Sequence, residues 1–194
     1  MENKISNIIK DYKDMFLIEN NRYGAIYRGI DSSSKRDVCI KIYCKELLEK
    51  GKADYLLKQI EREVELNKLC KSENILELYE SIDTPEAIIL KYEPYEMNLM
   101  DYLNKNGDFK SHNINFFKKI VQEIAKALQV LHKNGVIHRD IKPNNIFLIK
   151  NKLSSFRFDI KLGNFNSSIL VKENDYKQIG TILYTPPEIF KNIN

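Results

Sequence analysis

The chain has 194 residues, of which 43% are hydrophobic and 30% are charged, a balance typical of a globular protein with one sizeable core or two small ones. Its 31 basic and 27 acidic side chains leave a net charge of only +4, and the lysines are scattered among acidic neighbours. This composition argues against a disordered chain and against nucleic acid as a partner.

We expect no segment that would export or anchor the chain. No hydrophobic run approaches the roughly 18 apolar residues of a membrane span, and Met1 to Lys13 lack the apolar core of a secretory signal. The chain has three cysteines, Cys39, Cys44 and Cys70, an odd number with no metal-binding spacing. We therefore expect reduced, buried thiols. We therefore expect a cytoplasmic or nuclear location and no membrane partner.

Short β-prone runs dominate the stretch from Phe16 to Tyr43. Turn-forming residues separate them at 19–21 and 31–34, which predicts an antiparallel meander. Apolar residues then recur at helical spacing and predict a helix over Ala53 to Cys70. Two more strands are expected, near Ile75 to Ser81 and Ala87 to Tyr92.

The pattern becomes helical after Glu93. Asn98 is a predicted N-cap for a short helix that ends at Asn106-Gly107. The longest helix is expected from Asn113 to Lys133, with Gly135 just past its end. Its predicted apolar face consists of Phe117, Ile120, Val121, Ile124, Leu128 and Leu131. The order of elements indicates an α+β protein, with a β-rich part joined to a helical part near Lys91 to Tyr95.

The run from His138 to Asn145 reads His-Arg-Asp-Ile-Lys-Pro-Asn-Asn and precedes the apolar strand Ile146 to Ile149. It resembles the catalytic loop H-R-D-x-x-x-x-N of protein kinases of the Ser/Thr type. The resemblance implies that Asp140 accepts the substrate proton, that Lys142 contacts the transferring phosphate and that Asn145 binds a metal ion. His138 is expected to pack and anchor the loop rather than to react.

The resemblance covers nearly the whole chain and implies a two-lobe fold. Residues 1–92 would form the β-rich N-lobe with one regulatory helix, and residues 93–194 a truncated helical C-lobe. The run from Gly180 to Glu188 resembles the motif G-T-x-x-Y-x-A-P-E, so Thr181 is expected to approach Asp140 and Lys142. Since the chain stops six residues after Glu188, we expect four apolar side chains to be partly exposed: Ile182, Leu183, Ile189 and Phe190.

Lys41 ends the run Val38-Cys39-Ile40-Lys41 and resembles the strand lysine that holds the α- and β-phosphates of ATP. Glu63 matches the helix glutamate that pairs with this lysine. The resemblance implies ATP as cofactor, with Mg²⁺ or Mn²⁺. It places six further residues at the nucleotide: Gly24, Ile26, Cys39, Leu90, Tyr92 and Phe147.

Two departures from the kinase pattern bear on activity. Asn164-Phe165-Asn166 stands where the family has Asp-Phe-Gly, so the predicted metal ligands, Asn145 and Asn164, are both amides. An amide oxygen carries no charge, and Mg²⁺ prefers carboxylates and phosphates. Glu19 to Gly24 replaces G-x-G-x-x-G and keeps only the last glycine, which predicts weaker nucleotide binding. The general abundance of Asn in the chain is an alternative explanation for these amides.

The sequence therefore predicts an impaired kinase or pseudokinase that retains an ATP site. One alternative is a slow but active Ser/Thr kinase that transfers phosphate to protein hydroxyls. Another is a non-catalytic scaffold that binds a partner kinase or other protein, and a third is a non-functional remnant. The expected partners are accordingly a protein substrate or a partner kinase.

Overall fold

The computed structural model describes residues 9–21, 23–47, 53–106, 114–154, 156–173 and 180–190. By its internal contacts the chain divides into two units. The first consists of Met1–Leu57 and Glu77–Pro94, and the second of Lys58–Leu76 and Tyr95–Asn194. The two-part division predicted from the sequence had grouped Lys58–Leu76 with the N-terminal part, whereas the contacts of this segment group it with the C-terminal one.

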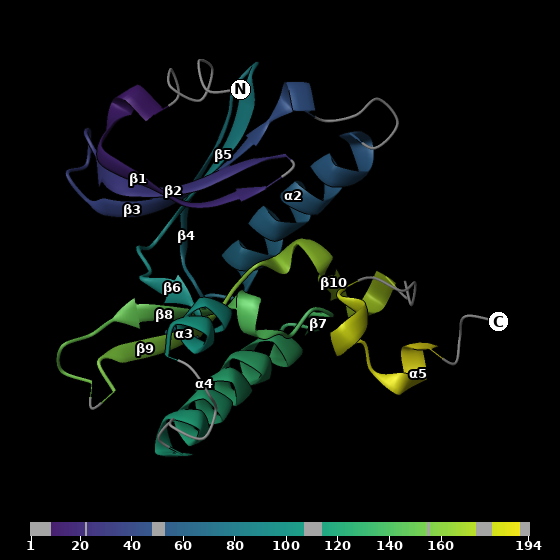
Figure 1. Cartoon of the computed structure of the whole chain (residues 1–194). Coiled ribbons are helices and arrows are strands. Elements are labelled where there is room, and N and C mark those ends of the chain that lie inside the picture. The colour runs from purple at the N-terminus through teal and green to yellow at the C-terminus, as the bar shows by residue number, and fades with distance from the viewer. Residues whose placement is uncertain are drawn as a thin grey trace. The chain divides into compact units, whose positions relative to one another are not determined.

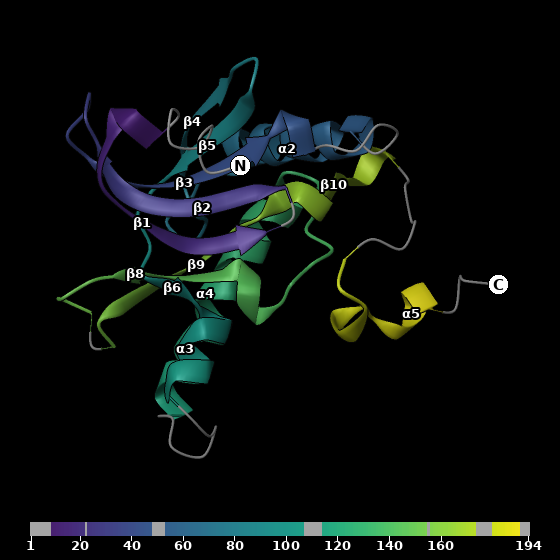
Figure 2. The same ribbon diagram turned by 45° about the horizontal axis from the view of Figure 1, so that its top comes forward.

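The first unit contains a five-stranded antiparallel sheet with the order β1-β2-β3-β5-β4. Figure 1 shows these strands, and Figure 2 shows β1 and β2 as a long curved hairpin. The antiparallel meander predicted near Phe16 to Tyr43 is confirmed, but residues 19–21, predicted as a turn, form the end of β1 and pair with β2, and β4 begins at Leu78 rather than near Ile75. The strand bounds are β1 Tyr12–Asn21, β2 Gly24–Asp31, β3 Asp37–Cys44, β4 Leu78–Asp83 and β5 Ala87–Tyr92.

One face of this sheet carries the hydrophobic core of the first unit. Alternate residues of β3 are buried in it because successive side chains of a strand point to opposite faces. This core consists of Tyr12, Val38, Ile40, Ile42, Cys44, Ala87 and Ile89. The intervening residues of β3, Cys39 and Lys41, belong to the other face.

The second unit contains helices and two small sheets. α2 (Ala53–Leu69) contributes its residues from Lys58 onward, and the other helices are α3 (Leu99–Asn106), α4 (Ile114–Lys133) and α5 (Pro187–Phe190). One sheet has the order β6-β8-β9, and in the other β7 pairs with β10. These strands are β6 Met97–Asn98, β7 Val136–Ile137, β8 Ile146–Lys150, β9 Phe158–Leu162 and β10 Ile169–Leu170.

The predicted helix ends agree with the capping geometry. Oδ1 of Asn98 accepts the backbone N–H of Asp101 at 2.9 Å, which confirms Asn98 as the N-cap of α3. Gly135 has φ +68 and donates its N–H to the His132 carbonyl at 2.9 Å, as expected of a glycine just past a helix. Gly107 and Asn113, which the prediction also used, lie outside the described residues.

α4 buries a face that differs in part from the predicted one. Its buried side chains are Phe116, Ile120, Ile124, Ala127 and Leu131, whereas Val121 is 69% exposed. The prediction of Val121 as a core residue was therefore wrong. Residues 116, 120, 124, 127 and 131 follow the 3.6-residue period, so Val121 falls about 100° away from Ile120 around the helix.

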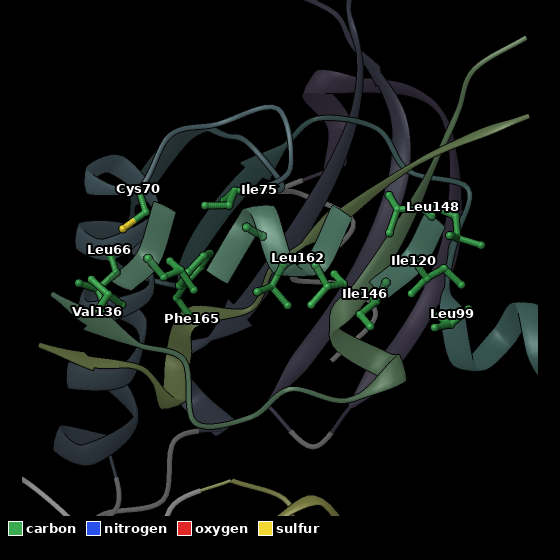
Figure 3. Close-up of a cluster of buried hydrophobic side chains, with 14 of the residues drawn as sticks. Leu66, Cys70, Ile75, Leu99, Ile120, Val136, Ile146, Leu148, Leu162 and Phe165 are labelled. Carbon is green, nitrogen blue, oxygen red and sulfur yellow. The ribbon is translucent and has the colours of Figure 1, made fainter. Parts of the chain in front are cut away.

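The core of the second unit joins α2, α3, α4 and the small sheets. Figure 3 shows it as a continuous cluster, with Leu66, Cys70 and Val136 at one end and Leu99 and Leu148 at the other. Ile75 contributes to this core and forms an isolated parallel bridge with Leu162, which explains why it is not part of β4. Within the described residues, no helix combines the length and apolar character needed to cross a membrane.

Candidate functional site

His138 fixes the start of the predicted catalytic loop. The residue is 2% exposed; Nδ1 of its ring accepts the Asp140 N–H at 3.3 Å, and Nε2 lies 3.1 Å from the Gly163 carbonyl oxygen. Because Nδ1 accepts, Nε2 carries the proton and donates to Gly163. Burial lowers the pKa of His138 to about 4, so the ring is neutral at pH 7. The expectation that His138 packs and anchors is consistent with this geometry.

The Asp140 carboxylate is surrounded by donors from its own unit. Oδ1 accepts the backbone N–H and the hydroxyl of Thr181 at 3.0 and 2.9 Å. Oδ2 accepts Nδ2 of Asn145 at 2.9 Å and lies 2.8 Å from Nζ of Lys142. Burial acts to raise the pKa of Asp140, but Lys142, Thr181 and Asn145 outweigh it, and the pKa lies below its ordinary value. Asp140 is therefore an ionised carboxylate at neutral pH.

Thr181 contacts both Asp140 and Lys142, as the resemblance predicted. Nζ of Lys142 donates to Oγ1 of Thr181 at 2.6 Å. The preceding Gly180 has φ +111, and a Cβ at this position would lie 2.5 Å from the Arg139 carbonyl oxygen. Only glycine therefore lets the chain approach the catalytic loop closely enough to place Thr181.

Asn145 and Asn164 are hydrogen bonded to each other. Nδ2 of Asn145 donates to the carbonyl oxygen of Asp140 at 2.7 Å and to its Oδ2 at 2.9 Å. Oδ1 of Asn145 accepts Nδ2 of Asn164 at 2.8 Å. Asn145 is 2% exposed. The two residues predicted as metal ligands thus lie together at the junction of the loop with the turn after β9.

The oxygen atoms available as metal ligands at this junction do not fit a magnesium ion. The Asn145 oxygen that would coordinate a metal already accepts a hydrogen bond, and Asn164 contributes no charge. The Asp140 carboxylate, which is bonded to Asn145, has donors on both oxygens. Mg²⁺ requires octahedral oxygen coordination and is usually bound through one or two carboxylates. Across the described part of the chain, no three His, Cys, Asp or Glu side chains are grouped as metal ligands.

Two residues in this region have left-handed backbone conformations. Arg139 has φ +66, and its Nε donates to the Ser167 carbonyl at 2.6 Å. Asn164 has φ +67 and ψ +74, which asparagine tolerates better than most residues. Asn166 instead belongs to the 3-10 turn Phe165–Ser167 and is not among the positive-φ residues. The Asn that replaces the family glycine therefore causes no backbone strain here.

In the first unit, six of the predicted nucleotide-binding residues share one face of the sheet. Ile26 pairs with Lys41, and Lys41 with Leu90, in the β2-β3-β5 register. Cys39 pairs with Tyr92 one row away. Directly paired residues and residues two apart lie on the same face, so Gly24 joins this set as well. Cys39 and Leu90 are fully buried, and Nζ of Lys41 lies 5.1 Å from the centre of the Tyr43 ring.

Gly24 has a packing role that the motif comparison did not reveal. A Cβ at Gly24 would lie 1.7 Å from the Ile42 carbonyl oxygen, so any side chain would force β2 away from β3. The one glycine retained from the G-x-G-x-x-G pattern is thus required by the sheet itself. Glu19 is exposed on β1, opposite Ile26.

The remaining two predicted nucleotide-binding residues belong to the second unit. Glu63 lies on α2 and is 1% exposed, unlike an ordinary surface glutamate. Phe147 lies on β8, with its ring centre 4.7 Å from that of Tyr95. Its edge would be 2.9 Å from a Cβ added at Gly163. The pairing of Glu63 with Lys41 stays a prediction.

The sequence reading missed an ion pair that involves the neighbour of Glu63. Arg62 on α2 contacts Glu173 of the turn Val171–Glu173 through a hydrogen-bonded ion pair.

The exposed apolar residues predicted after Gly180 are present, since Ile182 is 66% and Leu183 90% exposed. Ile189 is half-buried, and the side chain of Phe190 lies outside the described residues.

The β-rich unit, the helical unit and the loop around Asp140 define a protein-kinase-like α+β fold. Residues 13–194 match the family described as the protein kinase domain, and the chain belongs to the protein kinase family.

Serine/threonine kinases are among its relatives. Aurora kinase B of Mus musculus is 31% identical over 173 residues, which cover 88% of this chain and 46% of the relative. CBL-interacting serine/threonine-protein kinase 16 of Arabidopsis thaliana is 26% identical over 204 residues, which cover 98% of this chain and 41% of the relative. Sucrose non-fermenting protein kinase 1 of Fusarium virguliforme is 26% identical over 189 residues, with 96% and 25% covered. The chain spans less than half the length of these relatives.

Proposed function

We propose that this chain is a Ser/Thr-kinase-like domain in which phosphotransfer is impaired. The observation that carries the proposal is Asn164, a neutral amide that is hydrogen bonded to the Asn145 oxygen in place of a metal-binding carboxylate. Loss of one full negative charge at a metal that neutralises phosphoryl transfer would forfeit several kcal/mol, or on the order of 10²- to 10⁴-fold in rate. Mg²⁺ or Mn²⁺ would act only weakly at such a site.

The second candidate is a slow Ser/Thr kinase that acts on protein hydroxyls. It is favoured by the arrangement of Asp140, Lys142 and Thr181, in which an ionised carboxylate and a lysine lie around a hydroxyl. In this reading Asp140 orients the substrate hydroxyl and accepts its proton, and Lys142 stabilises charge on the transferring phosphoryl group.

ATP is the proposed ligand in both cases. In the first unit, Lys41 would neutralise phosphate charge, and Gly24, Ile26, Cys39, Leu90 and Tyr92 share its face of the sheet. Glu63 and Phe147 are the corresponding candidates in the second unit. Because Glu19 on β1 would add a negative charge beside the phosphates, we expect weak ATP binding.

Phosphotransfer from labelled ATP to a generic protein substrate tests the proposal. The wild-type chain is compared with Asn164→Asp, with Asn166→Asp as a matched control that adds the same charge two residues away, and with Asp140→Asn as a background. A gain of about 10²-fold or more in Asn164→Asp alone supports an impaired site. A wild-type rate equal to that of Asn164→Asp, and abolished in Asp140→Asn, would instead identify an active kinase.

A thermal-shift titration with ATP, with and without Mg²⁺ or Mn²⁺, tests nucleotide binding separately. Lys41→Ala should abolish any stabilisation by ATP, whereas Lys45→Ala, which removes the surface partner of Asp83, should not. A cooperative melt that ATP does not change, together with no transfer by any variant, would favour the scaffold that binds a partner kinase or other protein.

A further inference from the structure

We propose that the hydrogen bond between the amides of Asn145 and Asn164 takes the place of a bridging cation and holds the catalytic loop to the turn after β9. The free protein therefore binds no divalent metal ion at this site. The inference deepens the proposed function and rests on it for the identity of the site. Three observations on the second unit and one chemical argument support it.

The first observation is that the hydrogen bonds themselves fix the orientation of both amides. Nδ2 of Asn145 faces two acceptors, the carbonyl oxygen of Asp140 at 2.7 Å and its Oδ2 at 2.9 Å. An amide oxygen in that position would meet two acceptors and no donor. Oδ1 of Asn145 must therefore face Asn164, and Asn164 must present its nitrogen to it.

The second observation is that Asp140 is saturated with donors. A carboxylate offers about four acceptor positions. In this site they are taken by two groups of Thr181, by Nδ2 of Asn145 and by Nζ of Lys142, at 2.8 to 3.0 Å. A metal ion that approached Asp140 would have to displace at least one of these donors. It would also meet the positive charge of Lys142.

The third observation concerns the backbone of Asn164 in the structure that holds its hydrogen bond to Asn145. Its backbone is left-handed, with φ +67 and ψ +74, at the start of the turn Phe165–Ser167. Asparagine is one of the few residues with a side chain that visits this region readily. The same residue type therefore suits both the backbone and the side-chain contact.

The fourth argument concerns the carboxylate that Asn164 replaces. An aspartate at position 164 would set a carboxylate oxygen against Oδ1 of Asn145, so that two acceptors would face each other with no proton between them. Two such oxygens repel each other unless a bridging cation, a bridging water molecule or a proton on the acid lies between them. The amide at position 164 supplies the missing donor from the chain itself.

Thermal unfolding of the full chain without nucleotide tests this inference. Wild type should melt at the same temperature in EDTA and in millimolar Mg²⁺ or Mn²⁺. Asn164→Asp should melt roughly 2–8 °C lower in EDTA, because it loses a hydrogen bond and gains a repulsion between acceptors. Millimolar Mg²⁺ or Mn²⁺ should restore most of that loss, since an ion that binds only the folded form stabilises it.

Two variants serve as controls. Asn166→Asp adds the same charge to the same turn and keeps the oxygen that accepts the Ser167 hydroxyl at 3.2 Å, so it should melt like wild type and should not respond to the ions. Asn164→Ala removes the hydrogen bond to Asn145 without adding an acceptor, so it should be destabilised and remain insensitive to the ions. Isothermal titration of folded wild type with Mn²⁺ provides a measurement that does not depend on a variant, and no binding is expected.

Saturable binding of Mn²⁺ or Mg²⁺ to nucleotide-free wild type would overturn the inference. So would an Asn164→Asp variant that is as stable as wild type in EDTA, because the amide contact would then contribute nothing. The test contains neither ATP nor substrate, so the inference can fail while the phosphotransfer comparison still supports impairment. Conversely, an active wild type would refute the proposed function and leave these melting results unchanged.

Discussion

Thr181 donates its backbone N–H and its hydroxyl to the same oxygen of Asp140, Oδ1, at 3.0 and 2.9 Å. The two residues are 41 positions apart. This double contact, with the hydrogen bond from Lys142 to the Thr181 hydroxyl at 2.6 Å, fixes the segment after Gly180 to the catalytic loop. The Thr181 hydroxyl donates to Asp140 and accepts from Lys142, and so it links these two charged side chains.

Thr181→Val should destabilise the protein by about 1–3 kcal/mol, because it keeps the side-chain shape but leaves Asp140 and Lys142 each with one partner fewer. Thr181→Ser keeps the hydroxyl and should cost less than about 1 kcal/mol. Urea unfolding of the two variants provides the comparison. Equal stability of the Val and Ser variants would show that the hydroxyl contributes nothing to this contact.

Gly180→Ala should be more damaging than Gly135→Ala, although both glycines have positive φ. At Gly135 no atom lies within 4 Å of an added Cβ, so only the backbone cost of about 1 kcal/mol applies. At Gly180 the Cβ would also lie 2.5 Å from the Arg139 carbonyl oxygen, and the chain would have to move away.

Chemical denaturation should give the loss of stability for each glycine variant. Hydrogen exchange at the Thr181 amide should report whether the contact with Asp140 opens. We expect faster exchange in Gly180→Ala and unchanged exchange in Gly135→Ala. The same exchange rate in both variants would contradict the role assigned to Gly180.

The parts of the fold that could be predicted are those where the local pattern decides the structure. The meander, the N-cap at Asn98 and the glycine after α4 follow from turn chemistry and capping, which depend on neighbouring residues. The contact of Thr181 with Asp140 followed from a family motif. Family membership itself was predicted correctly from the run His138 to Asn145.

The parts that could not be predicted depend on long-range geometry. The bond between Asn145 and Asn164 requires a left-handed backbone at 164 and an amide orientation set by Asp140, neither of which the sequence specifies. The prediction for Val121 was wrong because Val121 and Ile120 are both apolar, and adjacent residues of a helix point about 100° apart, so only one of them can lie at the centre of the buried face. Arg62 and Glu173 carry no local signal that would pair them.

The stability of the protein should rise with pH between about 4 and 6.5 because of His138. Burial lowers its pKa to about 4, whereas an unfolded histidine titrates near 6.5. In this window the unfolded chain binds a proton that the folded chain does not, so acidification favours unfolding by up to about 3 kcal/mol. Above pH 6.5 both states are neutral at this position, and its effect disappears.

Denaturant unfolding from pH 5 to 8 should show this slope, at pH values above the range where carboxylates titrate. His138→Gln should flatten it, because glutamine does not titrate. His132→Gln, at an exposed histidine in the last turn of α4, should leave it unchanged. A slope that survives in His138→Gln would assign the pH dependence to other groups.

In the first unit, Lys91 should be a larger contributor to stability than a surface lysine. Its Nζ lies 3.1 Å from Oδ2 of Asp31 and 2.9 Å from Oε2 of Glu80, and 5.5 Å from the centre of the Tyr12 ring. The side chains of Lys91 and Asp31 are only 12% and 9% exposed. Burial acts to lower the pKa of Lys91, but hydrogen bonds to Glu80 and Asp31 outweigh it and raise the pKa.

Lys91→Met should cost about 3 kcal/mol, because it removes the cation beside the buried Asp31 carboxylate and leaves the neutral hydrogen-bond donors of Ser33 and Ser34. Glu80 is 55% exposed, so Glu80→Gln should cost less than about 1 kcal/mol. Asp31→Asn in the Lys91→Met background should recover part of the loss, since the uncompensated charge is removed. A double-mutant cycle measured by urea unfolding would give the coupling energy of Asp31 and Lys91, and a value near zero would contradict the buried ion pair.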